Sequence, residues 1–155
     1  MNVSVVCIGK LKERYFKEAE AEYLKRLSAF CRASVIEKKE YPLPKDSSDA
    51  LIQKAISAES ASILESASGA IIALSPDGAK MSSEAFASLL KAKISSGDVT
   101  FAVGGSYGLS PELKQRADAV VSFSDMTMPH QLFRIVLLEQ IYRAFMILGG
   151  RAYHK

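Results

Sequence analysis

The sequence predicts an α/β fold with a mainly parallel sheet and helices on both faces. Short apolar runs rich in β-branched residues alternate with longer segments in which apolar residues recur at helical spacing. This alternation is typical of parallel strands, because a helix usually connects one parallel strand to the next. The 155 residues contain no internal repeat, low-complexity tract or linker, which predicts one domain over residues 1–155.

The first half of the chain contains three strand-like runs and two helical segments. Strands are predicted at residues 3–8, 33–41 and 71–74, and helices at residues 13–30 and about 50–64. A proline-containing loop precedes the second helix and ends in the helix-capping residues Ser47, Ser48 and Asp49. The run at 71–74 is closed by Ser75-Pro76-Asp77-Gly78, which predicts a loop.

The second half continues this pattern. Ser82 or Ser83 is expected to cap a helix that runs to Ile94. The strand predicted at 99–103 leads into the loop Gly104-Gly105-Ser106-Tyr107-Gly108. Ser110-Pro111-Glu112 is typical of a helix start, with a capping serine, a proline at the first helical position and an acid in the first turn. A last strand is predicted at 119–123, followed by a loop and a long final helix.

The longest apolar stretch, Leu132 to Leu148, is interrupted by Arg134, Glu139 and Arg143. Charges inside a would-be membrane span favour an amphipathic helix of a soluble protein. The apolar run near the start of the chain is too short for a secretory signal. We therefore expect a cytoplasmic protein with no membrane partner.

The composition restricts the function only weakly. A net charge of +3 and a pI near 8.8 permit an RNA or phosphate partner without requiring one. Cys7 and Cys31 form no CxxC pair and no metal-ligand spacing, and each lies in an apolar stretch. We expect two buried free thiols in a reducing compartment, and no metal.

Three strand ends carry unusual loops, at residues 74–78, 104–108 and 124–130. Ligands of parallel sheets bind outside the carboxyl ends of the strands, so these loops predict the binding site. The glycines of the central loop allow either a close approach to a ligand or simply a tight turn. Their spacing matches neither a P-loop nor the dinucleotide-binding fingerprint.

Met126 and Met128 add an apolar lip to the third loop, where polar residues are usual. Such a lip suits an adenine ring or a thioether, but methionines packed under a neighbouring helix would give the same pattern. A flavodoxin-like protein is an alternative, with the glycine loop cradling a nucleotide or phosphate at a helix N-terminus. Against it, we expect no lysine and no acidic pair near these glycines.

Five motifs in a fixed order resemble the ribosomal RNA large subunit methyltransferase H family of the SPOUT class. They are Val103–Pro111, Phe123–His130, Leu132–Arg134, Glu139–Ala144 and Tyr153–Lys155. The resemblance covers essentially the whole chain, and the C-terminal third carries most of its specificity. Ser106-Tyr107 and Gly149–Ala152 depart from the family's commoner residues, and the second departure affects how the tail is directed.

The resemblance implies a fold, a substrate and a cofactor. The implied fold is a SPOUT-type α/β knot, with a trefoil knot at about residues 100–155. The implied substrate is a pseudouridine in a stem-loop of 23S ribosomal RNA, methylated at N3 on the assembled ribosome by a homodimer. The implied S-adenosyl-L-methionine site falls on Leu74, Gly104, Gly105, Phe123, Ser124, Asp125, Met126, Thr127 and Met128.

The resemblance also assigns the catalytic residues His154, Tyr153 and Arg134. A base that removes the N3 proton of a uracil-type ring would assist the reaction, and histidine suits neutral pH. His130, at the start of the final helix, is either such a base or a structural cap. In the family the tail of one subunit completes the other subunit's site. We therefore expect His154 to position the substrate or act as the base, and Tyr153 to stack on or hydrogen bond to the nucleobase.

The charged residues of segment 126–155 are mostly basic: Arg134, Arg143, Arg151 and Lys155 against Glu139, a net +3. We expect this charge to face RNA phosphates, although Glu139 and Arg143 are also spaced to pair on one helix. Two further interpretations stay open. One is a ribosome-binding factor without the cofactor, and the other is a SPOUT enzyme acting on tRNA, which the lack of an appended RNA-binding domain disfavours.

Overall fold

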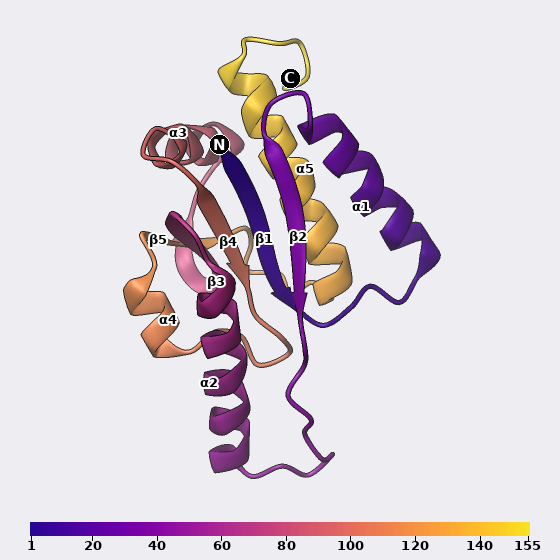
Figure 1. Cartoon of the computed structure of the whole chain (residues 1–155), viewed down its shortest axis with the longest axis vertical. Coiled ribbons are helices and arrows are strands. Elements are labelled where there is room, and N and C mark those ends of the chain that lie inside the picture. The colour runs from indigo at the N-terminus through magenta and orange to yellow at the C-terminus, as the bar shows by residue number, and fades with distance from the viewer.

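Five parallel strands form one sheet in the computed structural model, which describes all residues from Met1 to Lys155 (Figure 1). The strands are β1 (Asn2–Ile8), β2 (Arg32–Lys38), β3 (Ala70–Lys80), β4 (Val99–Val103) and β5 (Ala119–Ser122), in the order β2-β1-β4-β3-β5. The helices are α1 (Arg14–Leu27), α2 (Asp49–Ser66), α3 (Ser83–Ile94), α4 (Pro111–Arg116) and α5 (His130–Leu148). All pairings between neighbouring strands are parallel, which confirms the predicted α/β class.

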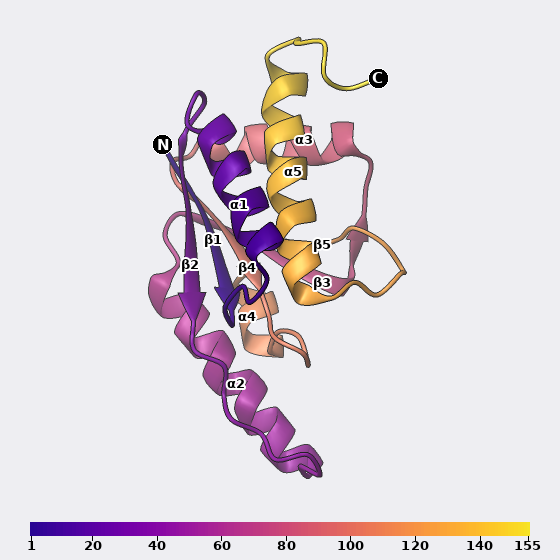
Figure 2. The same ribbon diagram turned by 90° about the vertical axis from the view of Figure 1, so that its right-hand side faces the viewer.

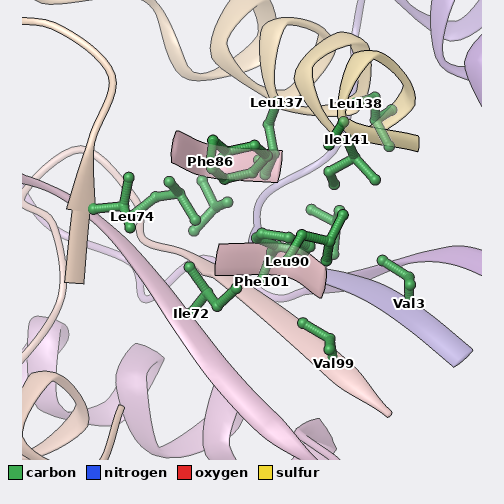
Figure 3. Packing of buried hydrophobic residues seen from close by; sticks show 14 of the residues in the cluster. Val3, Ile72, Leu74, Phe86, Leu90, Val99, Phe101, Leu137, Leu138 and Ile141 are labelled. Carbon is green, nitrogen blue, oxygen red and sulfur yellow. The ribbon is translucent and has the colours of Figure 1, made fainter. Parts of the chain in front are cut away.

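Helices cover both faces of the sheet, as predicted. On one face α5 packs against both α1 and α3 (Figure 2), while α2 and α4 lie on the other. Successive strand residues point to opposite faces, so Val5 of β1 belongs to the larger core cluster and Val6 to the smaller one. Figure 3 shows the larger cluster, in which Phe101 of β4 meets side chains of α3 and α5 such as Leu90 and Ile141.

Three helices begin at serines that the sequence singles out. The side chains of Ser48, Ser82 and Ser110 accept hydrogen bonds from backbone N–H groups in the first turns of α2, α3 and α4. These caps satisfy N–H groups that have no partner inside the helix, and each contributes about 1 kcal/mol. Ser82, rather than Ser83, is the cap of α3.

Strand β3 is longer than predicted, and the difference changes how β5 is held. Residues 75–78, predicted as a loop, lie inside β3. The register shifts after Leu74, so that Val121 of β5 pairs with both Leu74 and Ala79. Gly78 lies directly against β5, because a Cβ built on it would come within 2.6 Å of the Val121 backbone. The β3 chain thus passes β5 at a point where only glycine fits.

The final helix begins at His130, as predicted, and Pro129 precedes it without a side-chain hydrogen bond to its first turn. His130 Nε2 lies 3.4 Å from Ser106 Oγ. The helix buries Leu137 but leaves Leu132 41% exposed, so its apolar residues are not confined to one face. None of the helices has both the length and the apolar character needed to cross a bilayer.

Replacing Gly78 by alanine is expected to destabilise the protein by about 2 kcal/mol or more, because the added methyl group must displace the β5 backbone. Gly149→Ala is the matched control. Neither glycine has a positive φ, but a Cβ on Gly149 finds its nearest atom at 3.3 Å. Chemical unfolding of the three proteins measures the difference. Equal free energies of unfolding for the two variants would contradict the close packing of Gly78 on β5.

Candidate functional site

The three predicted loops come together around one cavity of about 740 Å³. Its wall takes residues from the end of β3, from the loop after β4 and from the segment that joins β5 to α5. All the residues predicted to contact the cofactor line it: Leu74, Gly104, Gly105, Phe123, Ser124, Asp125, Met126, Thr127 and Met128. The volume lies within the range of about 300–1,000 Å³ that is usual for small-molecule sites.

Backbone packing explains the glycines of the central loop. Gly105 and Gly108 form an isolated β-bridge, in which the Gly108 N–H donates to the Gly105 carbonyl at 3.1 Å. A Cβ on Gly104 would lie 2.6 Å from the Gly108 carbonyl, and Gly108 itself has a φ of +84°. The tight-turn interpretation is therefore confirmed, and the same turn forms part of the cavity wall.

Side-chain contacts tie the loops together at the rim of the cavity. Lys114 of α4 donates to Asp77 at 3.0 Å, and Lys80 pairs with Asp125. The Ser75 hydroxyl, and after it Lys114, lower the pKa of Asp77. The expectation that no lysine lies near the glycine loop is wrong, because the fold brings Lys114 to the cavity wall beside Asp77.

The segment after β5 presents Met126 at the mouth of the cavity. This residue is 80% exposed, and the Ser124 hydroxyl accepts a hydrogen bond from its backbone N–H at 2.9 Å. Phe123 packs against Phe86 and Phe133, with ring centroids 5.5 and 5.3 Å away. Met126 therefore does not pack under a neighbouring helix. Phe123 anchors the segment, and Met126 remains free to contact a ligand.

Arg134 does not line the large cavity. It is 3% exposed and lines an adjoining cavity of about 170 Å³. Its guanidinium donates to Glu37 at 2.9 Å, to Glu20 at 3.3 Å and to the Gly9 carbonyl at 3.0 Å. Burial raises the pKa of Glu20, and Arg134 opposes that shift. These contacts hold α1, β2 and the end of β1 against α5.

The C-terminal tail folds back onto its own chain. The Tyr153 hydroxyl donates to Glu139 Oε1 at 3.1 Å, and Arg143 donates to the same oxygen at 2.7 Å. The predicted pairing of Glu139 with Arg143 on the helix is thereby confirmed. Neither Tyr153 nor His154 lines the large cavity, so the predicted catalytic residues are not brought together with the predicted cofactor residues in one chain.

His154 is held by a donor on one side and an acceptor on the other. Arg143 Nη1 lies 3.2 Å from Nδ1, and because arginine can only donate, Nδ1 accepts. Nε2 therefore carries the proton and donates to Glu84 at 2.7 Å. The pKa of Glu84 is lowered to about 2, first by its own backbone N–H and then by His154. In this arrangement neither ring nitrogen is free to take a proton.

The basic C-terminal segment offers less free charge than its sequence implies. Arg134 and Arg143 are both paired with glutamates. Arg151 and Lys155 are exposed, and the Arg151 guanidinium lies 5.1 Å from the centre of the Phe30 ring. The predicted +3 already subtracts Glu139, the partner of Arg143, but it still counts Arg134, which Glu20 and Glu37 neutralise.

The two cysteines are free thiols, as predicted, but the expectation that both are buried is wrong for Cys31. Cys7 is buried and Cys31 is half-buried, and burial raises the pKa of each to about 11. At neutral pH both stay protonated and are poor nucleophiles. No group of three or more His, Cys, Asp or Glu side chains is arranged to hold a metal ion.

The sequence matches a family model described as Predicted SPOUT methyltransferase over residues 1–154. Proteins named Ribosomal RNA large subunit methyltransferase H are 48% identical in Carboxydothermus hydrogenoformans, 47% in Bacillus thuringiensis and 46% in Levilactobacillus brevis, with all of both chains covered. Among solved structures, a probable methylase family protein from Haemophilus influenzae Rd KW20 has a TM-score of 0.55 at 13% identity. That match covers 99% of this chain and 70% of the other, and it shows a shared fold.

Arg134→Met is expected to lower the free energy of unfolding by about 3 kcal/mol, because it leaves Glu20 and Glu37 without their cation. The value lies at the low end for a broken buried pair, since both glutamates are partly exposed. Arg14→Met is the matched control, since it removes an exposed pair with Glu18 and is expected to change stability by less than about 1 kcal/mol. Chemical unfolding at pH 7 compares the two, and similar losses would refute the structural role of Arg134.

Proposed function

Because the chain belongs to the ribosomal RNA large subunit methyltransferase H family of SPOUT methyltransferases, we propose that it methylates N3 of a pseudouridine in 23S ribosomal RNA. The methyl donor is S-adenosyl-L-methionine. The chain acts as a single domain in the cytoplasm, on the assembled ribosome. The observation that carries this proposal is the convergence of three strand-end loops on one cavity.

The lining of the cavity fits this cofactor. Leu74, Phe123 and Met128 offer apolar surface for an adenine ring and a thioether. The glycine loop exposes backbone N–H and C=O groups where side chains would otherwise stand, and such groups suit the polar edge of a nucleobase. We assign the cofactor site to the predicted residues of the three loops, with Met126 closing over the ligand.

Alignment is the main task of the protein in this reaction. The bound cofactor supplies a methyl group already activated by a sulfonium, so the residues must orient donor and acceptor. We assign Tyr153 and His154 to positioning the nucleobase. His154 takes the N3 proton only when Arg143 releases Nδ1, because both ring nitrogens are otherwise engaged. Arg134 supports the site from outside the cavity.

A homodimer would bring the two parts of the site together. The 19 residues of α5 span about 28 Å, with His130 at the cavity and the tail beyond the other end. This length keeps the tail away from the cavity of its own chain. We therefore propose that it enters the cavity of a second subunit. The exposed Leu132 on α5 supports an interface along this helix.

We also propose that residues of about 100–155 form the trefoil knot of the SPOUT class. Two features support it. Strand β3 contacts β5 twice, on either side of Gly78. The chain then passes from α4, on the α2 face of the sheet, through β5 to α5 on the opposite face. Knots are rare exceptions among protein folds, so this threading rests on the family as well as on the geometry.

Calorimetric titration tests the cofactor first. We expect the purified protein to bind S-adenosylmethionine, and not ATP or FMN. Binding of ATP or FMN alone would support the nucleotide-binding alternative, with the glycine loop holding phosphate. Failure to bind any of the three would support a ribosome-binding factor without catalytic activity.

His154→Ala is expected to reduce methyl transfer about 100-fold or more, as is usual when a positioning or acid–base group is lost. Its affinity for S-adenosylmethionine should stay unchanged, because the residues assigned to the cofactor all belong to the three loops and not to the tail. Transfer of radiolabelled methyl groups to pseudouridine-containing ribosomes measures the effect. Gln53→Ala, an exposed change on α2, is the control. If His154→Ala transfers methyl groups as fast as the unchanged protein, the tail has no part in the site. If the unchanged protein methylates tRNA but not ribosomes, the tRNA alternative is favoured.

A further inference from the structure

Glu59 is a buried acid that the mechanism above does not use. It lies on α2 and is only 7% exposed. Its Oε2 has no hydrogen-bond partner, and it is the only such buried side-chain atom in the chain. Buried carboxylates normally have a cation or several donors around them, because an isolated charge is strongly disfavoured away from water. An unpartnered oxygen at this position therefore requires an explanation.

The carboxyl group of Glu59 lies against the glycine loop. A Cβ built on Gly105 would lie 3.1 and 3.2 Å from its two oxygens. Gly105 lines both the large cavity and the smaller one beside it. The next residue on α2, Ser60, accepts a hydrogen bond from the Ser110 N–H at 2.8 Å, which fixes this part of α2 against the end of the same loop. The acid thus lies against a residue that lines both cavities.

The protein itself provides no counter-charge for Glu59. Burial raises its pKa, the Tyr41 backbone N–H opposes that shift, and the one charged group that acts on it is a second acid, Glu40. No lysine, arginine or histidine contributes. A ligand in a cavity lined by Gly105 would bring a positive charge toward this acid.

We propose that Glu59 recognises a cationic centre of S-adenosylmethionine, acting through Gly105 as the counter-charge of the bound cofactor. This proposal rests on the proposed function, and it adds a specificity-determining residue outside the three loops. S-adenosylmethionine carries two cations, the sulfonium and the α-ammonium. In a site screened from bulk water, a carboxylate within several ångströms of either cation is expected to strengthen binding about tenfold or more.

Glu59→Gln tests the proposal, because it removes the charge and keeps the shape. Glu65→Gln, an exposed acid on the same helix, is the matched control. Calorimetry with three probes locates the charge: S-adenosylmethionine has both cations, S-adenosylhomocysteine only the ammonium, and methylthioadenosine neither. A loss of about tenfold confined to S-adenosylmethionine assigns Glu59 to the sulfonium. A loss for the first two but not the third assigns it to the ammonium.

Other outcomes overturn the proposal. Equal losses for all three probes would mean that Glu59 only shapes the loop, and unchanged affinities would mean that it has no part in binding. If the unchanged protein fails to bind S-adenosylmethionine, the proposed function itself fails. Acid provides a second readout. As the pH falls and Glu59 is protonated, the unchanged protein should lose affinity for the cationic probe more steeply than Glu59→Gln does.

The stability of the free protein gives a third, independent test. A raised pKa means that the ionised acid disfavours the folded state, so stability is lost as the pH rises from the usual value of 4.5 through the folded pKa. At pH 8, Glu59→Gln is therefore expected to unfold at a higher temperature than the unchanged protein, and the difference should vanish below about pH 4.5. Glu65→Gln should show no such gain. A Glu59→Gln protein less stable at pH 8 would mean that the carboxylate has a partner within the fold.

Discussion

The position of β5 is the constraint on which the site depends. This strand has four residues and forms an edge of the sheet beside β3. A strand so short gains little from one ladder of hydrogen bonds, but Val121 pairs with Leu74 and again with Ala79. The cavity takes its walls from the residues directly after Leu74 and directly after Ser122. The double pairing therefore sets the distance between two of the three loops, and it also fixes where the chain turns toward α5.

The rim contacts act on loops that the strands have already placed. Lys114 and Asp77 join β3 to α4, while Lys80 and Asp125 join β3 to the segment before α5. Exposed ion pairs of this kind add little to stability. Their value lies in holding the loops in one arrangement before a ligand arrives, which reduces the entropy lost on binding. Positioning, rather than stability, explains why these charged pairs lie around the cavity.

Local signals predicted the elements and the place of the site, but not the contacts between distant side chains. Serine caps could be identified because cap geometry involves only neighbouring residues, and the loops could be grouped because carboxyl ends of parallel strands meet at one edge. The extension of β3 was missed, since Pro76 and Gly78 are turn residues unless β5 lies beside them. The sequence nevertheless contained signals for two buried charged residues. Arg134 interrupts an apolar helix, and Glu59 shares a helical stripe with buried Ala55 and Ile63.

Arg134 and Glu59 are both buried, but their surroundings are opposite. We therefore assign Arg134 a structural role and Glu59 a role in ligand binding. Arg134 meets a carboxylate or carbonyl on three sides, so its burial is compensated and it joins elements of the fold. Glu59 has an oxygen without a donor and another acid as its charged neighbour. A protein retains such a destabilising group where a ligand supplies the missing charge. Gly105 connects the acid to the site. Because it has no side chain, Glu59 can approach it closely, and Gly105 still lines the cavity.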